Sequence, residues 1–223
     1  YQLIIGGAPG PIMTGTGSSL NFGLQTTGGY YTVKATNANG CVQNMTGSAS
    51  VTISALPTAL GVTGGGNYCS GSAGVPVGLG GSVMGISYRL YWGTTPIGSA
   101  ILGTGSPINF GMQTLAGGYT VMATNTTTGC TRLMTGSATV GVNTSPAAYA
   151  VAGGGGYCAG GTGVNIGIGG SASGVMYRLY RGTTLVTGPI AGTGAAIDFG
   201  LQTTAGTYSV TGTDAISGCV TNM

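Results

Sequence analysis

Only 3% of the 223 residues are charged, with five Lys or Arg, two Asp or Glu and no His, and the formal net charge is +3. Five scattered cations cannot form the clustered basic surface that nucleic-acid binding requires, so we expect no nucleic-acid partner. Hydrophobic residues make up 42% of the chain, but no apolar run is long enough to cross a bilayer as a helix. We therefore expect a folded chain without a membrane-spanning segment.

One phrase occurs three times along the chain and indicates an internal repeat. It reads FGLQTTGGYYTV at 22–33, FGMQTLAGGYTV at 110–121 and FGLQTTAGTYSV at 199–210. The cysteines have the same spacing, because Cys41, Cys130 and Cys219 lie 89 residues apart, as do Cys69 and Cys158. A fixed period of this kind predicts an array of structural repeats, here of about 89 residues.

The period divides the chain into three predicted domains. Residues 1–57 would be the C-terminal part of a repeat, residues 58–146 a complete repeat, and residues 147–223 a repeat that lacks its last strand. Neither end of the sequence coincides with a predicted repeat boundary, so we expect a window from a longer array. Under that expectation, the lack of a signal peptide here is uninformative.

Apolar residues alternate with small residues in the complete copy, which predicts strands with one buried face. In chain order the strand-like segments are VPVGLGG (75–81), SYRLYW (87–92), IGSAILG (97–103), PINFGMQ (107–113), GGYTVMAT (117–124) and GSATVGV (136–142), with a further one like AYAVAG (148–153). The inward-facing residues would be Val75, Val77, Leu79, Tyr88, Leu90, Trp92, Tyr119, Val121, Ala123, Ala138, Val140 and Val142. About seven strands and no helical periodicity predict an all-β chain of tandem immunoglobulin-like β-sandwich repeats.

The repeated phrase has a structural interpretation within such a sandwich. The Phe would end one strand, the GLQT or GMQT segment would turn the corner, and Tyr31, Tyr119 and Tyr208 would open the next strand. A buried Tyr at this corner needs a hydrogen-bond partner, which the upstream backbone supplies in a tyrosine corner. We therefore interpret the phrase as a folding device rather than as a triplicated binding loop.

Several short motifs recur in a fixed order: Tyr-Cys at 68–69 and 157–158, Gly-Cys at 40–41, 129–130 and 218–219, and Met-Thr-Gly-Ser-Ala at 45–49 and 134–138. This order resembles the tandem Ig-like or PKD-like repeats of large secreted surface proteins of Bacteroidota, which include adhesins and gliding-associated proteins. The resemblance covers the whole chain and implies export, attachment to the bacterial cell surface and a structural or adhesive task. The chain departs from antibody-type domains at Val121 and Val210, where those domains place the second Cys of their inter-sheet disulfide.

Two cysteines per copy at a fixed phase predict disulfides and an oxidising compartment, because a thiolate metal site needs four Cys or added His. The simplest pairing lies within a copy and joins Cys69 to Cys130 and Cys158 to Cys219. In a seven-stranded sandwich, however, those positions lie roughly 20 Å apart for strands of about seven residues. A disulfide allows Cα separations of only about 4.4–6.8 Å. A pairing between neighbouring copies, Cys69 with Cys219, is therefore the alternative.

Residues for catalysis are scarce. Without His or Glu, the candidates for acid–base chemistry are Asp198 and Asp214, and their counterparts one repeat earlier are Asn109 and Asn125. Because Asp and Asn replace each other between copies, these positions are predicted to be turn-forming Asx residues. The serines have no base that could activate them as nucleophiles. Two carboxylates are also too few for a calcium site. We expect no enzyme, no catalytic residues, no cofactor and no metal.

The predicted outer faces carry Gly, Ser, Thr and Ala, whereas a soluble monomer usually carries charge there. Such flat faces lose little side-chain entropy on contact, which favours packing against like repeats. We therefore predict a structural repeat region of an extracellular surface fibre or giant adhesin. The alternative is a ligand-binding module, for surface glycans through Trp92, Tyr91 and Tyr180 or for ice through Thr arrays. Trp92 becomes Arg181 in the next copy, so that aromatic residue does not recur.

Overall fold

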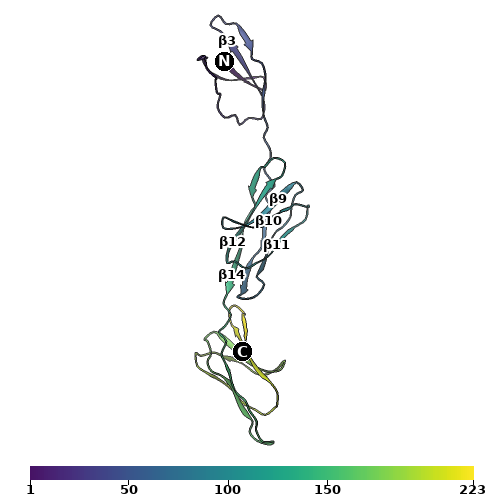
Figure 1. Cartoon of the computed structure of the whole chain (residues 1–223), viewed down its shortest axis with the longest axis vertical. Helices are drawn as coiled ribbons and strands as arrows, with labels where there is room; N and C mark the ends of the chain where they lie inside the picture. The colour runs from purple at the N-terminus through teal and green to yellow at the C-terminus, as the bar shows by residue number, and fades with distance from the viewer. The chain divides into compact units, whose positions relative to one another are not determined.

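The structure is a computed structural model that describes all 223 residues, and every regular element in it is a β-strand (Figure 1). The predicted all-β class is therefore confirmed. The chain divides into two compact units, one made of Tyr1–Pro57 with Asn125–Thr131 and the other of Thr58–Thr124 with Arg132–Met223. The three predicted domains of residues 1–57, 58–146 and 147–223 stay a prediction.

The first unit contains one sheet of five strands. Its strand order is β2-β1-β3-β4, and β5 pairs with β3 as well. The strands are β1 (Gln2–Ile5), β2 (Ala8–Ile12), β3 (Gly29–Thr36), β4 (Val42–Asn44) and β5 (Ala49–Val51). Leu3 and Tyr31 are the buried hydrophobic residues of this sheet, each with 5% of its surface exposed. One sheet without a facing sheet buries little, so this core is small.

Two sheets form the first part of the second unit. One sheet has the order β10-β9-β12-β14-β7, and β13 also pairs with β12. The other sheet has the order β11-β8-β6. The strands are β6 (Val62–Gly64), β7 (Gly66–Cys69), β8 (Val75–Leu79), β9 (Ile86–Trp92), β10 (Thr95–Leu102), β11 (Ile108–Gln113), β12 (Gly117–Asn125), β13 (Thr131–Leu133) and β14 (Ala138–Asn143). Their inner faces share one hydrophobic cluster, to which Val77, Leu90 and Val121 belong.

The remaining strands repeat this arrangement with a constant offset. One sheet has the order β15-β16-β19 and the other β18-β17-β20-β21. The strands are β15 (Val151–Gly153), β16 (Val164–Ile168), β17 (Val175–Arg181), β18 (Thr184–Ala191), β19 (Ile197–Gln202), β20 (Tyr208–Asp214) and β21 (Val220–Asn222). Six of them begin and end 89 residues after β6, β8, β9, β10, β11 and β13. Their core is a second cluster that includes Ile166, Leu179 and Val210.

The alternation of apolar and small residues predicts most of the buried face correctly. Tyr88, Tyr119 and Val121 are fully buried in the core. Three predicted core residues differ, of which Val75, at the start of β8, is half-buried and packs against the core. Val142 is 40% exposed, because the end of β14 extends past the core and pairs there with β7. Trp92 is half-buried, and its indole N–H donates to the carbonyl of Ala116 at 3.0 Å.

The repeated phrase forms two local devices. The Tyr31, Tyr119 and Tyr208 hydroxyls each donate to a carbonyl four residues upstream, at 2.6, 2.9 and 2.6 Å, which confirms the predicted backbone partner. In the second and third copies the Gly of the phrase makes a bulge inside a strand instead of a corner: Gly111 and Gly200 have φ values of +85° and +81°, and the register of β11–β8 and of β16–β19 shifts there. The Gln113 side-chain amide stabilises the bulge in β11 by donating hydrogen bonds to the carbonyls of Phe110 and Gly111.

Candidate functional site at the Cys69–Cys219 disulfide

Cys69 is positioned by a pair of glycines that move the chain from one sheet to the other. β6 pairs with β8, whereas β7, two residues later, lies parallel to β14 in the opposite sheet. Gly64 and Gly65 make this switch with φ values of +88° and +82°, and a Cβ at Gly65 would lie 2.6 Å from the carbonyl oxygen of Thr139. Only glycine fits so strained and crowded a position. Cys69 is thereby placed opposite Asn143, the last residue of β14.

Cys219 is positioned by an Asx turn between β20 and β21. The Asp214 carboxylate accepts hydrogen bonds from the backbone N–H groups of Ser217 at 2.7 Å and Ile216 at 3.1 Å, and from the Ser217 hydroxyl at 2.9 Å. These bonds stabilise the ionised carboxylate, so the pKa of Asp214 lies below its ordinary value, the Ser217 N–H having the largest effect. The turn returns the chain so that Cys219 is fully buried.

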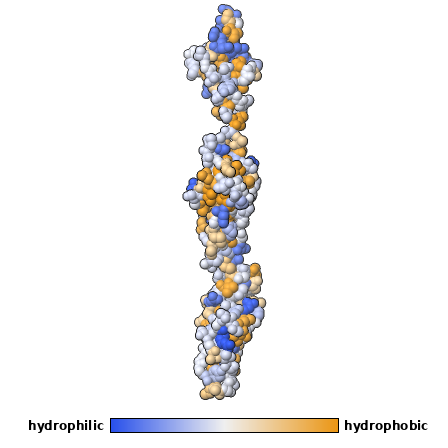
Figure 2. All heavy atoms as spheres, turned by 90° about the vertical axis from the view of Figure 1, so that its right-hand side faces the viewer, coloured by the Kyte–Doolittle hydropathy of each residue, from blue (hydrophilic) through white to orange (hydrophobic).

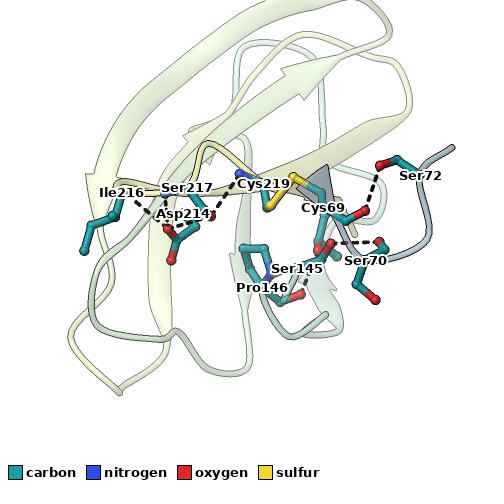
Figure 3. The surroundings of a disulfide bond; sticks show 10 residues. Cys69, Ser70, Ser72, Ser145, Pro146, Asp214, Ile216, Ser217 and Cys219 are labelled. Atoms are coloured by element: carbon teal, nitrogen blue, oxygen red, sulfur yellow. Dashed lines mark hydrogen bonds between the residues drawn. A yellow bond between two sulfur atoms is a disulfide. The ribbon is translucent and has the colours of Figure 1, made fainter. Parts of the chain in front are cut away.

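The two sulfurs form a disulfide that closes a loop with a sequence separation of 150 residues (Figure 3). The Cα atoms of Cys69 and Cys219 lie 5.5 Å apart, inside the usual range for a disulfide of about 4.4–6.8 Å. Cys69 is the last residue of β7, the edge strand beside β14, and Cys219 lies in the turn between β20 and β21 of another sheet. The bridge therefore spans the segment that joins the two pairs of sheets.

That joining segment is also held by hydrogen bonds from both sides. The Ser70 N–H donates to the carbonyl of Asn143 at 2.8 Å, directly after β7. From the other side, the Thr221 hydroxyl in β21 donates to the carbonyl of Pro146 at 2.7 Å. Ser70, Ser145 and Pro146 surround the disulfide in Figure 3. The chain between β14 and β15 thus runs beside a covalent link and is tied to each of its flanking strands.

This pairing corrects the one predicted from the sequence. The expected bonds of Cys69 with Cys130 and of Cys158 with Cys219 do not form; the alternative between neighbouring copies is the one observed. The reason is the sheet switch at Gly64 and Gly65, which carries Cys69 to the far end of β14. Cys130 and Cys158 are free thiols, as is Cys41. The Gly-Gly-Gly run before Asn67 is the sequence signal that could have revealed the switch.

The other residues singled out in the sequence have local partners. The Asp198 carboxylate accepts the Gly200 N–H at 2.7 Å and the Asn165 side-chain amide at 3.1 Å. Asp214 thus lies in a turn as predicted, whereas Asp198 lies inside β19 at a register shift and not in a turn. No group of three or more His, Cys, Asp or Glu side chains comes together. Tyr91 and Tyr180, considered for glycan contact, are half-buried. No helix in the chain has the length and apolar character needed to cross a membrane.

Comparison with known proteins yields little. No protein-family model and no curated protein matches this chain. Among solved structures, the chain is similar to a Ca²⁺-stabilised adhesin that helps an Antarctic bacterium reach out and bind ice, with a TM-score of 0.41 and 17% identity. The match covers 100% of this chain and 62% of that chain, so this chain spans less than two thirds of the adhesin's length. At such a TM-score the likeness supports no conclusion about function.

Proposed function

We propose that this chain is a structural repeat region of an extracellular bacterial surface fibre or giant adhesin, built from immunoglobulin-like sandwiches of about 89 residues. The observation that carries the proposal is the Cys69–Cys219 disulfide, which joins one pair of sheets to the next across the joining segment. A fibre transmits force along its length. A covalent bond at each joint between repeats is a direct way to resist that force.

The same bond supports an extracellular compartment. Structural disulfides persist outside the cytoplasm, where no thiol-reducing system keeps cysteines reduced. With Cys69 half-buried and Cys219 fully buried, the bond is part of the packed structure. We therefore place the chain at the cell surface or beyond it.

The surface supports a building task rather than a catalytic one. Apolar residues such as Ile12, Met84 and Ile216 are at least 74% exposed, and the chain has seven charged side chains in all. Figure 2 shows apolar and weakly polar areas over much of one face, with small, separate areas of strongly hydrophilic surface. Surfaces of this kind favour contact with like surfaces. We infer that the partners of the chain are further copies of the same repeat.

The resistance of the chain to force can be tested by stretching single molecules from both termini. With the Cys69–Cys219 bond intact, the 150 residues of sequence between the two cysteines cannot extend. At about 3.3–3.6 Å per residue, this removes roughly 500 Å from the final extended length. The reduced chain should recover that length. Equal final lengths of the oxidised and the reduced chain would overturn the proposal. Cys41→Ser is the control, because this change leaves the disulfide and the length that it holds back unchanged.

A further inference from the structure

Every charged residue of the chain lies inside a β-strand. The five cations are in β3, β9, β13 and β17, and they are Lys34, Arg89, Arg132, Arg178 and Arg181. The two carboxylates are in β19 and β20. No turn or connecting segment of the chain therefore contains a charged side chain.

This distribution matters for proteases that cut after Lys or Arg. Proteolysis concentrates at exposed segments, because a protease needs a stretch of chain that is not held in other structure. Residues 144–150, which join β14 to β15, have no regular structure and would suit a protease, but they contain neither Lys nor Arg. A cation inside a strand can be reached only after the sheet opens locally, and such an opening is rare in a well-paired sheet.

Four of the five cations lie in a strand that has a neighbouring strand on each side. β3 lies between β1 and β4, β9 between β10 and β12, and β17 between β18 and β20. Arg132 differs, because β13 has only three residues, all of them exposed, and β12 is its one neighbour in the sheet. Opening β13 breaks fewer strand pairings than opening β9 or β17. Such a protease should therefore cut first after Arg132.

The Cys69–Cys219 disulfide encloses this weakest site. Arg132 lies between the two cysteines in the sequence, as do three of the other four cations. Hydrolysis of the peptide bond after Arg132 consumes one water and leaves a carboxylate on one piece and an amine on the other, while the disulfide stays intact. The sheet also holds the two pieces together, because β12 before the cut pairs with β14 after it. A single cut at this site therefore does not divide the chain.

We propose that two features of the fold make this chain resistant to extracellular proteases that cut after Lys or Arg. The confinement of the cations to strands slows the first cut. The Cys69–Cys219 bond then keeps a chain that has been cut between these cysteines in one piece. This resistance rests on the proposed function, because surface proteins meet proteases outside the cell and a fibre fails when its chain is divided.

The experiment digests the folded, oxidised chain with trypsin. The parent for these digestions is Lys34→Thr, because Lys34 is the one cation outside the loop that the disulfide closes. Thr is the matched replacement, since Thr211 follows the third copy of the repeated phrase as Lys34 follows the first.

Mass spectrometry should place the first cut of the parent after Arg132. Denaturing electrophoresis without a reducing agent should show no separate fragments. Reduction after the protease has been inactivated should release residues 1–132 and 133–223. Fragments that separate without reduction would overturn the proposal, and so would a first cut after Arg89, Arg178 or Arg181.

A variant with a cation in the joining segment tests both features together. Ala148 is exposed and lies outside any strand. Ala148→Lys should be cut after residue 148 at least about tenfold faster than the parent is cut at any site, because no sheet has to open. Ala148→Gln is the matched control, since a long side chain without charge should leave the rate of the parent unchanged. The chain cut at residue 148 should also stay in one piece until the disulfide is reduced.

Two outcomes separate this resistance from the proposed function. If the parent is cut as fast as Ala148→Lys while the 150-residue separation is still held back under force, the protease resistance is wrong and the proposed function stands. If the chain cut at residue 148 falls apart without reduction, the disulfide does not join the two pieces, and both proposals are wrong.

Discussion

β5 and β14 share their preceding sequence and differ in nearly everything that surrounds them. Met134 and Ala138 are 2% exposed, whereas Met45 is 37% exposed and Ala49 is also exposed. The difference comes from neighbours, because β14 has β7 beside it and a second sheet opposite, and β5 has neither. Strand propensity and alternation are local, but burial depends on which other elements are present.

The cysteines of the three Asx turns show the same contrast. Asn37, Asn125 and Asp214 each accept backbone N–H bonds from the residues that follow them. The turns are therefore alike. Cys219 is bonded and fully buried, while Cys41 and Cys130 are free. A turn positions a thiol, but only a segment from elsewhere in the chain or from another chain provides its partner.

The largest effect should come from removing the Cys69–Cys219 disulfide. In the chain-entropy model, a disulfide across a 150-residue separation contributes about 5 kcal/mol to the free energy of unfolding. We expect Cys219→Ser to lower this free energy by about that amount, as measured by denaturant unfolding. Cys69→Ser combined with Cys219→Ser should cost no more than either change alone, because both remove one bond. A Cys41→Ser effect of similar size would refute this account.

A smaller effect on the free energy of unfolding should distinguish β14 from β5. Val140 is 1% exposed in β14 and Val51 is half-buried in β5. Val140→Ala removes buried methyl groups and leaves a cavity, so we expect a loss of about 2 kcal/mol, against under about 1 kcal/mol for Val51→Ala. Hydrogen exchange followed by mass spectrometry measures the two units separately. Equal losses would show that the edge of β5 is as well packed as β14.

The smallest effect concerns the charge that distinguishes the Cys219 turn from the other two. Hydrogen bonds lower the folded-state pKa of Asp214, so its stabilisation is complete above the ordinary value of 3.8 and is lost as the pH falls through the lowered value. We expect the amides of residues 215–218 to lose protection in acid. Asp214→Asn should keep the turn, as Asn125 does, and abolish this pH dependence. If the amides of the variant still lost protection in acid, a group other than Asp214 would be responsible for the loss.

Most of the strand pattern could be predicted from the sequence, while the candidate site could be predicted only as one of two alternatives. Alternation placed Tyr88, Leu90 and Val121 correctly in the core, since the period of a strand is a local property. Val142 differed because β14 continues past the core to meet β7. β7 itself was not predicted, since a four-residue strand after three glycines has no alternating pattern to recognise.

The sequence by itself determined the period of 89 residues, the all-β class, the Asx turns and the tyrosine hydrogen bonds, because each depends on residues close together along the chain. Only the tertiary structure decided the partner of Cys69. That choice depends on a change of sheet at Gly64 and Gly65 and on a parallel pairing between segments about 74 residues apart in the chain, from Gly66 to Val140. The spacing of the cysteines does not show in which direction the chain runs at Cys69. Because β7 runs parallel to β14, Cys69 lies opposite Asn143 and beside Cys219.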